Sequence, residues 1–153
     1  MNKKVLMLVR SAVIAALYFC LTTFLAPISF GPIQFRIAEA MCLLPLIFPE
    51  ASLGLCVGCA LANISSPFGI WDMAVGSLVT LVAGVLTAKS KNILVGGLPP
   101  VLLNAFILPI IWSVMGVGEI YIINVLCMLL SQSVVIYGGG TVLVKVLKKR
   151  IRY

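Results

Sequence analysis

Long runs of apolar residues, separated by short polar loops, dominate this chain of 153 residues. The hydrocarbon core of a bilayer is about 30 Å thick, and a helix needs roughly 20 apolar residues to cross it. Because only 10% of the residues are charged and 62% are hydrophobic, the chain cannot cover a surface in water. The composition excludes a soluble enzyme, a disordered tail and a disulfide-linked secreted module. It predicts an integral membrane protein.

Prolines and polar loops divide the apolar sequence into six predicted helices. Their ranges are 5–25, 37–48, 51–64, 70–88, 93–115 and 120–147. The second and third reach only about 18–21 Å at 1.5 Å per residue, so we expect short helices supported by their neighbours. We expect Gly96-Gly97 to interrupt the fifth helix and the Gly138-Gly139-Gly140 run to weaken the sixth. A basic start before the first run also fits a signal peptide, but no small-residue cleavage pattern precedes Pro27.

The basic residues support this count. With six crossings both termini lie on one side, and ten of the eleven basic residues fall there: Lys3, Lys4, Arg10, Lys89, Lys91, Lys145, Lys148, Lys149, Arg150 and Arg152. Cytoplasmic loops carry such an excess of Lys and Arg. We therefore expect an all-α bundle of six transmembrane helices, a single membrane domain over residues 1–153, in the plasma membrane with both termini cytoplasmic. The +7 charge is then a topology signal, and no nucleic acid is expected as a partner.

The residues needed for catalysis and metal binding are scarce. The chain has no histidine, which is the commonest metal ligand and general base. Its five cysteines all lie in apolar runs, so we interpret them as packing residues: Cys20, Cys42, Cys56, Cys59 and Cys127. No Gly-Lys-Ser/Thr phosphate loop occurs, so ATP would be hydrolysed elsewhere. We predict no catalytic residue, no metal and no cofactor.

Polar side chains gather at the predicted outer ends of the helices. They are Arg36, Glu39, Asn63, Trp71, Asp72, Glu119, Tyr121 and Asn124, and Asn104 and Gln132 extend the set inward. Ionisable groups in membrane spans are costly and usually face a cavity or a partner. The group therefore predicts an outward-facing pocket of net negative character, suited to a small, planar, polar or cationic ligand.

Each of these residues also has a purely structural interpretation. Asp72 and Glu119 are acids in the first turn of a helix, where the helix dipole favours them. Arg36 and Glu39 are three residues apart and would pair with each other. Asn63 would cap a helix, and the aromatic side chains would belong to an interfacial belt.

Small residues recur on one face of three predicted helices. Ala12 and Ala16 share a face of the first, Gly54 and Gly58 share a face of the third, and Gly76, Thr80, Gly84 and Ala88 follow one another down the fourth. Such stripes allow helices to pack closely in lipid. They fit either packing within the bundle or contact with another membrane subunit.

At this point the chain resembles the QueT family of membrane proteins. The resemblance is carried by Gln34-Phe35-Arg36-Ile37-Ala38-Glu39-Ala40, Leu44-Pro45, Phe48-Pro49-Glu50-Ala51, Gly54-Leu55, Gly58-Cys59-Ala60-Leu61-Ala62-Asn63 and the run from Asp72 to Leu81. Ala38 stands where the family usually has Ser. The family's members are proposed substrate-binding (S) components of energy-coupling factor (ECF) transporters for queuosine precursors.

The resemblance implies a partner, a substrate and a docking face. S components are six-helix bundles that bind a vitamin-like solute outside the cell and dock on a transmembrane coupling subunit driven by two ATPase subunits. Ala12 and Ala16 match the docking face of the first helix. The implied substrate is a 7-deazaguanine such as preQ1, with a cationic aminomethyl group. We expect one carboxylate (Glu39, Asp72 or Glu119) to read its N–H edge, a second to pair the amine, Trp71 or a nearby aromatic to stack, and Asn104 or Asn124 to meet the carbonyl.

The resemblance also implies a mechanism, in which the loops at residues 26–36, 64–71 and 115–120 close over the ligand before the protein reorients. Three other functions stay open. One is an S component for another vitamin-like solute, and the next is a stand-alone channel or proton-coupled carrier. The last is a structural membrane subunit without a ligand.

Overall fold

The computed structural model describes residues 2–30, 33–66, 69–116 and 119–151, and every regular element in these ranges is helical. The elements in chain order are α1 (Lys3–Phe24), α2 (Ala26–Ser29), the 3₁₀-helix η1 (Ile37–Leu46), α3 (Ala51–Ala62), the 3₁₀ turn η2 (Asn63–Ser65), α4 (Gly69–Ala88), α5 (Ile93–Val114), α6 (Tyr121–Ser133), the π-helical η3 (Val134–Gly140) and α7 (Thr141–Ile151). The last three form one continuous helix. The all-helical architecture agrees with the sequence prediction.

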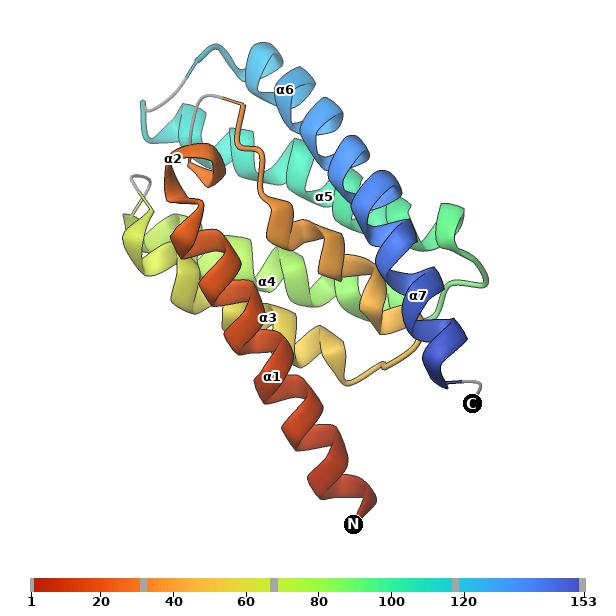
Figure 1. Cartoon of the computed structure of the whole chain (residues 1–153). Coiled ribbons are helices and arrows are strands. Elements are labelled where there is room, and N and C mark those ends of the chain that lie inside the picture. The colour runs from red at the N-terminus through yellow and green to blue at the C-terminus, as the bar shows by residue number, and fades with distance from the viewer. Residues whose placement is uncertain (1, 31–32, 67–68, 117–118, 152–153) are drawn as a thin grey trace.

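Among the described residues, four helical segments are long and apolar enough to cross a membrane: α1, α4, α5 and the continuous segment Tyr121–Ile151. The remaining two predicted segments are the shorter apolar helices Ile37–Leu46 and Ala51–Ser65. Figure 1 shows both ends of the chain at one end of the bundle, with α2 and the start of α6 at the other. Six crossings and cytoplasmic termini remain predictions.

The short helix η1 runs through the middle of the bundle (Figure 1). It contacts α1, α3, α4, α5, η3 and α7, and most of its side chains are buried. Ten residues in 3₁₀ winding rise about 20 Å at 2.0 Å each, so η1 is too short to cross a bilayer as a lipid-facing helix. Its neighbours cover its backbone, which is the condition under which short segments are tolerated at membrane depth.

Two of the three small-residue stripes pack inside the bundle. A Cβ added at Gly54 would lie 2.5 Å from the Ser11 carbonyl oxygen, and one at Gly58 would lie 2.8 Å from the Ala15 carbonyl oxygen. These glycines therefore let α3 press against α1. In the same way, a Cβ at Gly84 of α4 would lie 2.9 Å from the Ser52 side chain on α3.

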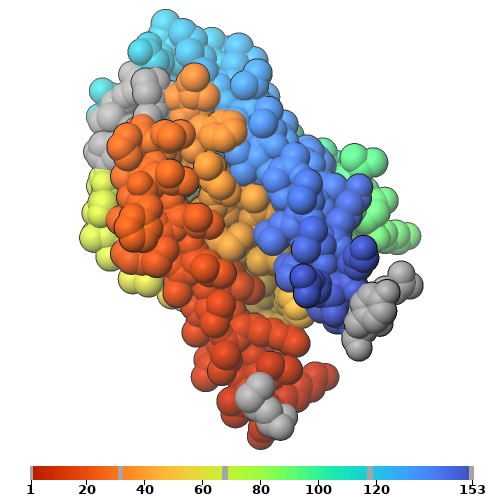
Figure 2. Space-filling model, viewed as in Figure 1, coloured from red at the N-terminus to blue at the C-terminus, as the bar shows by residue number. Residues whose placement is uncertain are grey.

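The third stripe remains on the outside. Ala12 and Ala16 are exposed, whereas Ile14, Ala15 and Tyr18 of α1 face the bundle. Figures 1 and 2 show the N-terminal half of α1 extending beyond the body of the bundle. The alanine face is therefore not consumed by packing within the chain.

The expected interruption at Gly96-Gly97 is wrong, because α5 runs through it without a break. Pro100 lacks the N–H that would bond the Gly96 carbonyl, and the Thr87 hydroxyl donates to that carbonyl instead at 2.7 Å. The two glycines admit neighbouring side chains. An added Cβ would lie 3.0 Å from Leu46 at Gly96 and 2.5 Å from the Tyr137 ring at Gly97.

The glycine run in the last helix coincides with a change of winding. Residues 134–140 are π-helical, and α-helix resumes at Thr141. A Cβ at Gly140 would lie 2.8 Å from the Ala40 carbonyl oxygen, so this glycine allows the last helix to contact η1.

Candidate functional site

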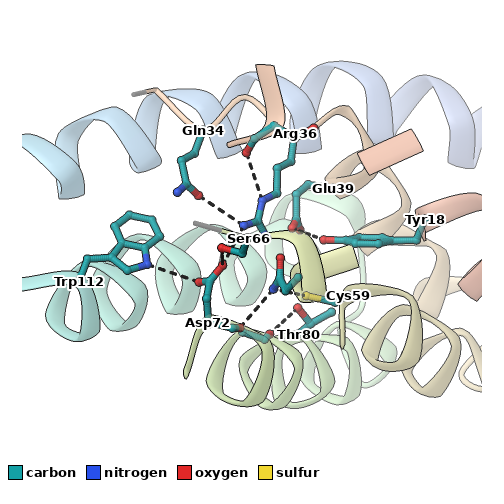
Figure 3. Close-up of polar contacts among 12 residues, drawn as sticks. Tyr18, Gln34, Arg36, Glu39, Cys59, Ser66, Asp72, Thr80 and Trp112 are labelled. Carbon is teal, nitrogen blue, oxygen red and sulfur yellow. Dashed lines mark hydrogen bonds and ion pairs between the residues drawn. The ribbon is translucent and has the colours of Figure 1, made fainter. Parts of the chain in front are cut away.

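A buried polar cluster lies at the end of the bundle away from the termini, and its centre is Asp72 (Figure 3). Asp72 is in the first turn of α4, and its side chain is inaccessible to solvent, at 0% exposure. We call the buried side chains around it the Asp72 cluster: Tyr18, Ser29, Gln34, Arg36, Glu39, Cys42, Asn63, Ser66, Asp72 and Trp112. They come from α1, α2, the segment before η1, η1 itself, the end of α3, the segment after η2, α4 and α5.

The Asp72 carboxylate accepts from three side chains. Arg36 Nη2 lies 3.3 Å from Oδ2, and the Ser66 hydroxyl donates to the same oxygen at 2.8 Å. The indole N–H of Trp112 donates to Oδ1 at 3.4 Å. The Asn63 amide donates to the Asp72 backbone carbonyl at 3.1 Å. Both charges of the Arg36–Asp72 pair are shielded from water, with side-chain exposures of 3% and 0%.

Glu39 is the second buried acid of the cluster, 2% exposed. The Tyr18 hydroxyl donates to its Oε1 at 2.6 Å, and the Cys42 thiol donates to its Oε2 at 2.9 Å. Both donors are neutral, and among the described residues Glu39 forms no ion pair. With both acids ionised, one cation faces two anions, and the cluster carries a net negative charge.

Several polar atoms around Arg36 and Asp72 lack partners. Arg36 donates to the Ser29 carbonyl at 3.4 Å and to Gln34 Oε1 at 3.5 Å. The Ser29 hydroxyl, the Gln34 amide nitrogen and the Asn63 amide oxygen are buried, and within the described ranges none has a hydrogen-bond partner. A buried polar group without a partner costs about 1–3 kcal/mol. The cluster therefore suits a ligand that brings both donors and acceptors.

The structure brings four sequence candidates together, namely Arg36, Glu39, Asn63 and Asp72. The expected pairing of Arg36 with Glu39 is absent from the ion pairs of the described residues, and Arg36 pairs with Asp72. Asn63 does end α3, as the structural interpretation expected, but its amide reaches α4 as well. One residue thus serves both the helix end and the cluster.

The other candidates are exposed, hydrogen-bonded to other residues, or buried elsewhere in the bundle. Trp71 is 60% exposed, and Glu119 is exposed. The Asn124 amide donates to the Glu119 carbonyl at 2.8 Å and so holds the start of α6. The Tyr121 hydroxyl donates to the Phe106 carbonyl oxygen at 3.5 Å. Asn104 is buried on α5, 3% exposed.

Sequence reasoning missed Trp112 and Tyr18 as members of the cluster. Both are aromatic residues within apolar runs, where packing or lipid contact is the ordinary expectation. The available signal was chemical: an indole N–H and a phenol O–H need partners when they are buried. In this chain their partners are the two buried acids.

The comparisons with known proteins agree with one another. A family model described as QueT transporter matches residues 8–149, which include every candidate site residue. A curated relative, the queuosine precursor transporter QueT of Lactococcus lactis subsp. cremoris (strain MG1363), is 39% identical over 77 residues. That alignment covers 49% of this chain and 45% of the relative, so it spans less than half of the relative's length. No solved structure matches the chain.

Proposed function

The chain belongs to the QueT transporter family, and from this premise we propose that it is the substrate-binding membrane subunit of an ECF importer for a queuosine precursor. The substrate is a 7-deazaguanine such as preQ1. The observation that carries the proposal is the Asp72 cluster, in which two acids and one arginine are buried in a chain otherwise poor in charge. Ionisable groups inside a membrane protein mark substrate sites by default.

The cluster matches the chemistry of this ligand. A 7-deazaguanine presents a ring N–H and an amino group side by side, and a carboxylate accepts both in parallel. Asp72 is the acid for this edge, since its oxygens already collect N–H and O–H donors from three side chains. The indole of Trp112, which touches Asp72 and is 2% exposed, is the nearby aromatic side chain.

Glu39 is the acid for the cationic group of the ligand. It has only neutral donors among the described residues, and the cluster has an excess of negative charge. An aminomethyl group, protonated at neutral pH, supplies the missing cation. Asn63 Oδ1 and Gln34 Nε2, both without described partners, offer an acceptor and a donor for the remaining ligand edges. An ill-matched base would leave such buried groups unsatisfied, which is a strong source of selectivity.

A direct binding measurement tests the substrate. Calorimetry on the purified protein with preQ1, preQ0, guanine and riboflavin should give tight binding of a deazaguanine and no binding of riboflavin. Asp72→Asn should abolish the binding heat, while Glu50→Gln, a charge removal at the other end of the bundle, should leave it intact. Tight riboflavin binding would indicate an S component for another solute. No binding of any of these solutes would contradict the proposal.

The transport step needs partners, which we take to be a transmembrane coupling subunit and two ATPase subunits. Support comes from the exposed alanine face of α1. Ala12 lines a groove of about 390 Å³ between α1 and α3, together with Ala15, Leu53 and Gly54. A side chain of a partner helix would fit this apolar groove. In this mechanism, the loaded protein tips against the coupling subunit and releases its solute into the cytoplasm, where both termini lie.

Uptake in cells that express the partner subunits tests the docking face. Ala12→Trp and Ala16→Trp should leave preQ1 binding unchanged and stop uptake, because a large side chain blocks close approach of another helix. Val82→Trp is the matched control, since Val82 lies on α4 and is 51% exposed. Normal uptake by both alanine variants would remove the docking assignment, and uptake without any partner would indicate a stand-alone carrier.

A further inference from the structure

Arg36 is held loosely for a buried arginine. Its three hydrogen-bond contacts, to Ser29, Gln34 and Asp72, measure 3.3–3.5 Å. Hydrogen bonds between a charged nitrogen and a carboxylate are normally about 2.7–2.9 Å. Its Nη2 serves both Gln34 and Asp72, and no hydrogen bond of Nη1 occurs among the described residues. The guanidinium therefore uses only part of its donor capacity.

The segment that carries Arg36 is also under backbone strain. Gln34 has a backbone φ of +49°, a value that residues other than glycine rarely adopt. Its side-chain nitrogen is buried without a described partner. The Arg36 side chain itself lies over the Phe30 ring, with its central carbon 5.1 Å from the ring centroid. Nothing in this arrangement fixes the guanidinium to Asp72 through the paired contacts that arginine and a carboxylate make at their best.

The guanidinium and the proposed substrate present the same chemistry to Asp72. A guanidinium is a planar group with adjacent N–H donors, and the N–H edge of a 7-deazaguanine is a planar pair of adjacent N–H donors. The Asp72 carboxylate has about four acceptor positions, two on each oxygen. Ser66 and Arg36 fill both positions on Oδ2, and Trp112 fills one on Oδ1, so a second planar donor pair cannot reach both oxygens while Arg36 stays. The Arg36 guanidinium and the substrate edge therefore compete for one carboxylate.

We propose that Arg36 is a displaceable internal partner of Asp72, which the planar N–H pair of the substrate replaces on binding. In the empty protein Arg36 neutralises Asp72 and keeps the buried acid folded into the bundle. When the substrate arrives, its N–H pair takes the carboxylate and the guanidinium moves away, with the Phe30 ring, the Ser29 carbonyl and the Gln34 side-chain oxygen as its remaining contacts. The Asp72 receptor thus selects ligands that reproduce an arginine head group, and affinity is set by the exchange.

This inference rests on the proposed function for the identity of the ligand, but the receptor can be tested without the ligand. Arg36→Ala leaves Asp72 without its cation, and free guanidinium is the probe. Low concentrations of guanidinium chloride should raise the melting temperature of Arg36→Ala by roughly 3–6 °C at ten times its dissociation constant. Sodium chloride and tetramethylammonium chloride at equal ionic strength should not.

The controls use the other ion pair among the described residues, Arg10–Glu50. Arg10→Ala removes an arginine from a pair of the same length, Arg10–Glu50 at 3.3 Å, whose arginine side chain is 40% exposed. Guanidinium should produce no saturable stabilisation there, nor in the double variant Arg36→Ala with Asp72→Asn. Equal responses to guanidinium and tetramethylammonium in Arg36→Ala would overturn the receptor.

Affinity for preQ1 tests the exchange itself. If Arg36 occupies Asp72 in about nine of ten empty molecules, its removal strengthens apparent binding about tenfold. Arg36→Ala binding preQ1 more weakly than the wild-type protein would overturn the proposal, because Arg36 would then contact the ligand directly. Should Arg36→Ala fail to fold, Arg36→Lys keeps the charge without the planar donor pair and should bind preQ1 at least as tightly as wild type. Weaker binding by Arg36→Lys would overturn the proposal equally.

The Arg36 exchange and the identity of the substrate can be refuted independently. A wild-type protein that binds preQ1, with an Arg36→Ala variant that binds it no better, refutes the exchange and leaves the transporter. A wild-type protein that ignores preQ1, with guanidinium rescue of Arg36→Ala intact, refutes the substrate and leaves Asp72 as a receptor for planar N–H donors.

Discussion

Two ion pairs of equal length lie at opposite ends of the bundle, and their surroundings differ. Arg10–Glu50 joins α1 to the residue before α3 at the end where the termini lie, and Arg36–Asp72 lies at the other end. Both contacts measure 3.3 Å. In each pair the guanidinium also lies over a phenylalanine ring, Phe48 at 4.5 Å and Phe30 at 5.1 Å.

Exposure to solvent separates the two pairs. The side chains of Arg10 and Glu50 are 40% and 9% exposed, and those of Arg36 and Asp72 are 3% and 0% exposed. Partly exposed pairs contribute about 0–1 kcal/mol, because water screens them. Burying both charges costs several kcal/mol per ion before their attraction offsets it. A pair like Arg10–Glu50 is explained by local structure, whereas the buried pair needs a further reason, and the proposed substrate binding supplies one.

The largest expected effect comes from Asp72→Asn. This change removes the carboxylate and leaves Arg36 buried without a counter-charge, so unfolding free energy should fall by about 3–5 kcal/mol. The substrate loses two hydrogen bonds to a charged group, each worth about 1.5–3 kcal/mol, so preQ1 binding should become undetectable. Thermal unfolding and calorimetry measure the two effects. Undiminished preQ1 binding by a folded Asp72→Asn protein would remove Asp72 from the site.

Glu39→Gln should alter selectivity more than stability. The variant keeps the shape of the side chain and removes the negative charge that has only the neutral donors Tyr18 and Cys42. Affinity for preQ1, which is cationic, should fall about tenfold or more, while affinity for preQ0, which carries an uncharged nitrile, should hardly change. Calorimetry with both ligands gives the ratio. An equal loss for both ligands would show that Glu39 does not read the amine.

Trp112→Phe should have a smaller effect in the same cluster. Phenylalanine keeps an aromatic ring but lacks the N–H that donates to Asp72 Oδ1 at 3.4 Å. Because the net value of one such hydrogen bond is about 0.5–1.5 kcal/mol, preQ1 affinity should fall by roughly 2- to 13-fold. Trp71→Phe is the matched variant outside the cluster, and it should lower the affinity for preQ1 by less than Trp112→Phe does. If Trp71→Phe costs more than Trp112→Phe, the exposed tryptophan is the one at the ligand.

The smallest effects belong to the exposed pair. Arg10→Ala and Glu50→Gln should each lower the unfolding free energy by about 1 kcal/mol or less, with preQ1 affinity unchanged. Chemical or thermal unfolding of these two variants and of Asp72→Asn compares their unfolding free energies. If Arg10→Ala lowers the unfolding free energy as much as Asp72→Asn does, burial does not explain the difference between the two ion pairs.

The fold could be predicted from the sequence further than the site could. Apolar length and proline positions predict six helical segments, and the structure has helices in all six places, while six membrane crossings stay a prediction. The 3₁₀ winding of η1 was not predictable, since its ten residues, apolar except for Glu39, show no period that separates it from an α-helix. The break expected at Gly96-Gly97 was wrong for a tertiary reason. The Thr87 hydroxyl of the preceding helix donates to the Gly96 carbonyl, and the Tyr137 ring of the last helix fills the space beside Gly97.

Of the candidate site, the charged residues were predictable and their partners were not. A charge within an apolar chain stands out by its cost, and three of the four charged candidates, Arg36, Glu39 and Asp72, lie together in the buried cluster, whereas Glu119 is exposed. Their pairing depends on which helices meet, and the nearest acid in sequence to Arg36 is Glu39 rather than its partner Asp72. Aromatic side chains such as Trp112 carry no comparable signal until their N–H is known to be buried.

The most direct test of the central claim is a calorimetric titration of preQ1 into wild-type, Asp72→Asn and Glu50→Gln proteins, side by side. The account predicts tight binding by the wild-type and Glu50→Gln proteins and no measurable binding by Asp72→Asn. Binding that is lost in Glu50→Gln and kept in Asp72→Asn would contradict it, and so would a folded wild-type protein that does not bind preQ1.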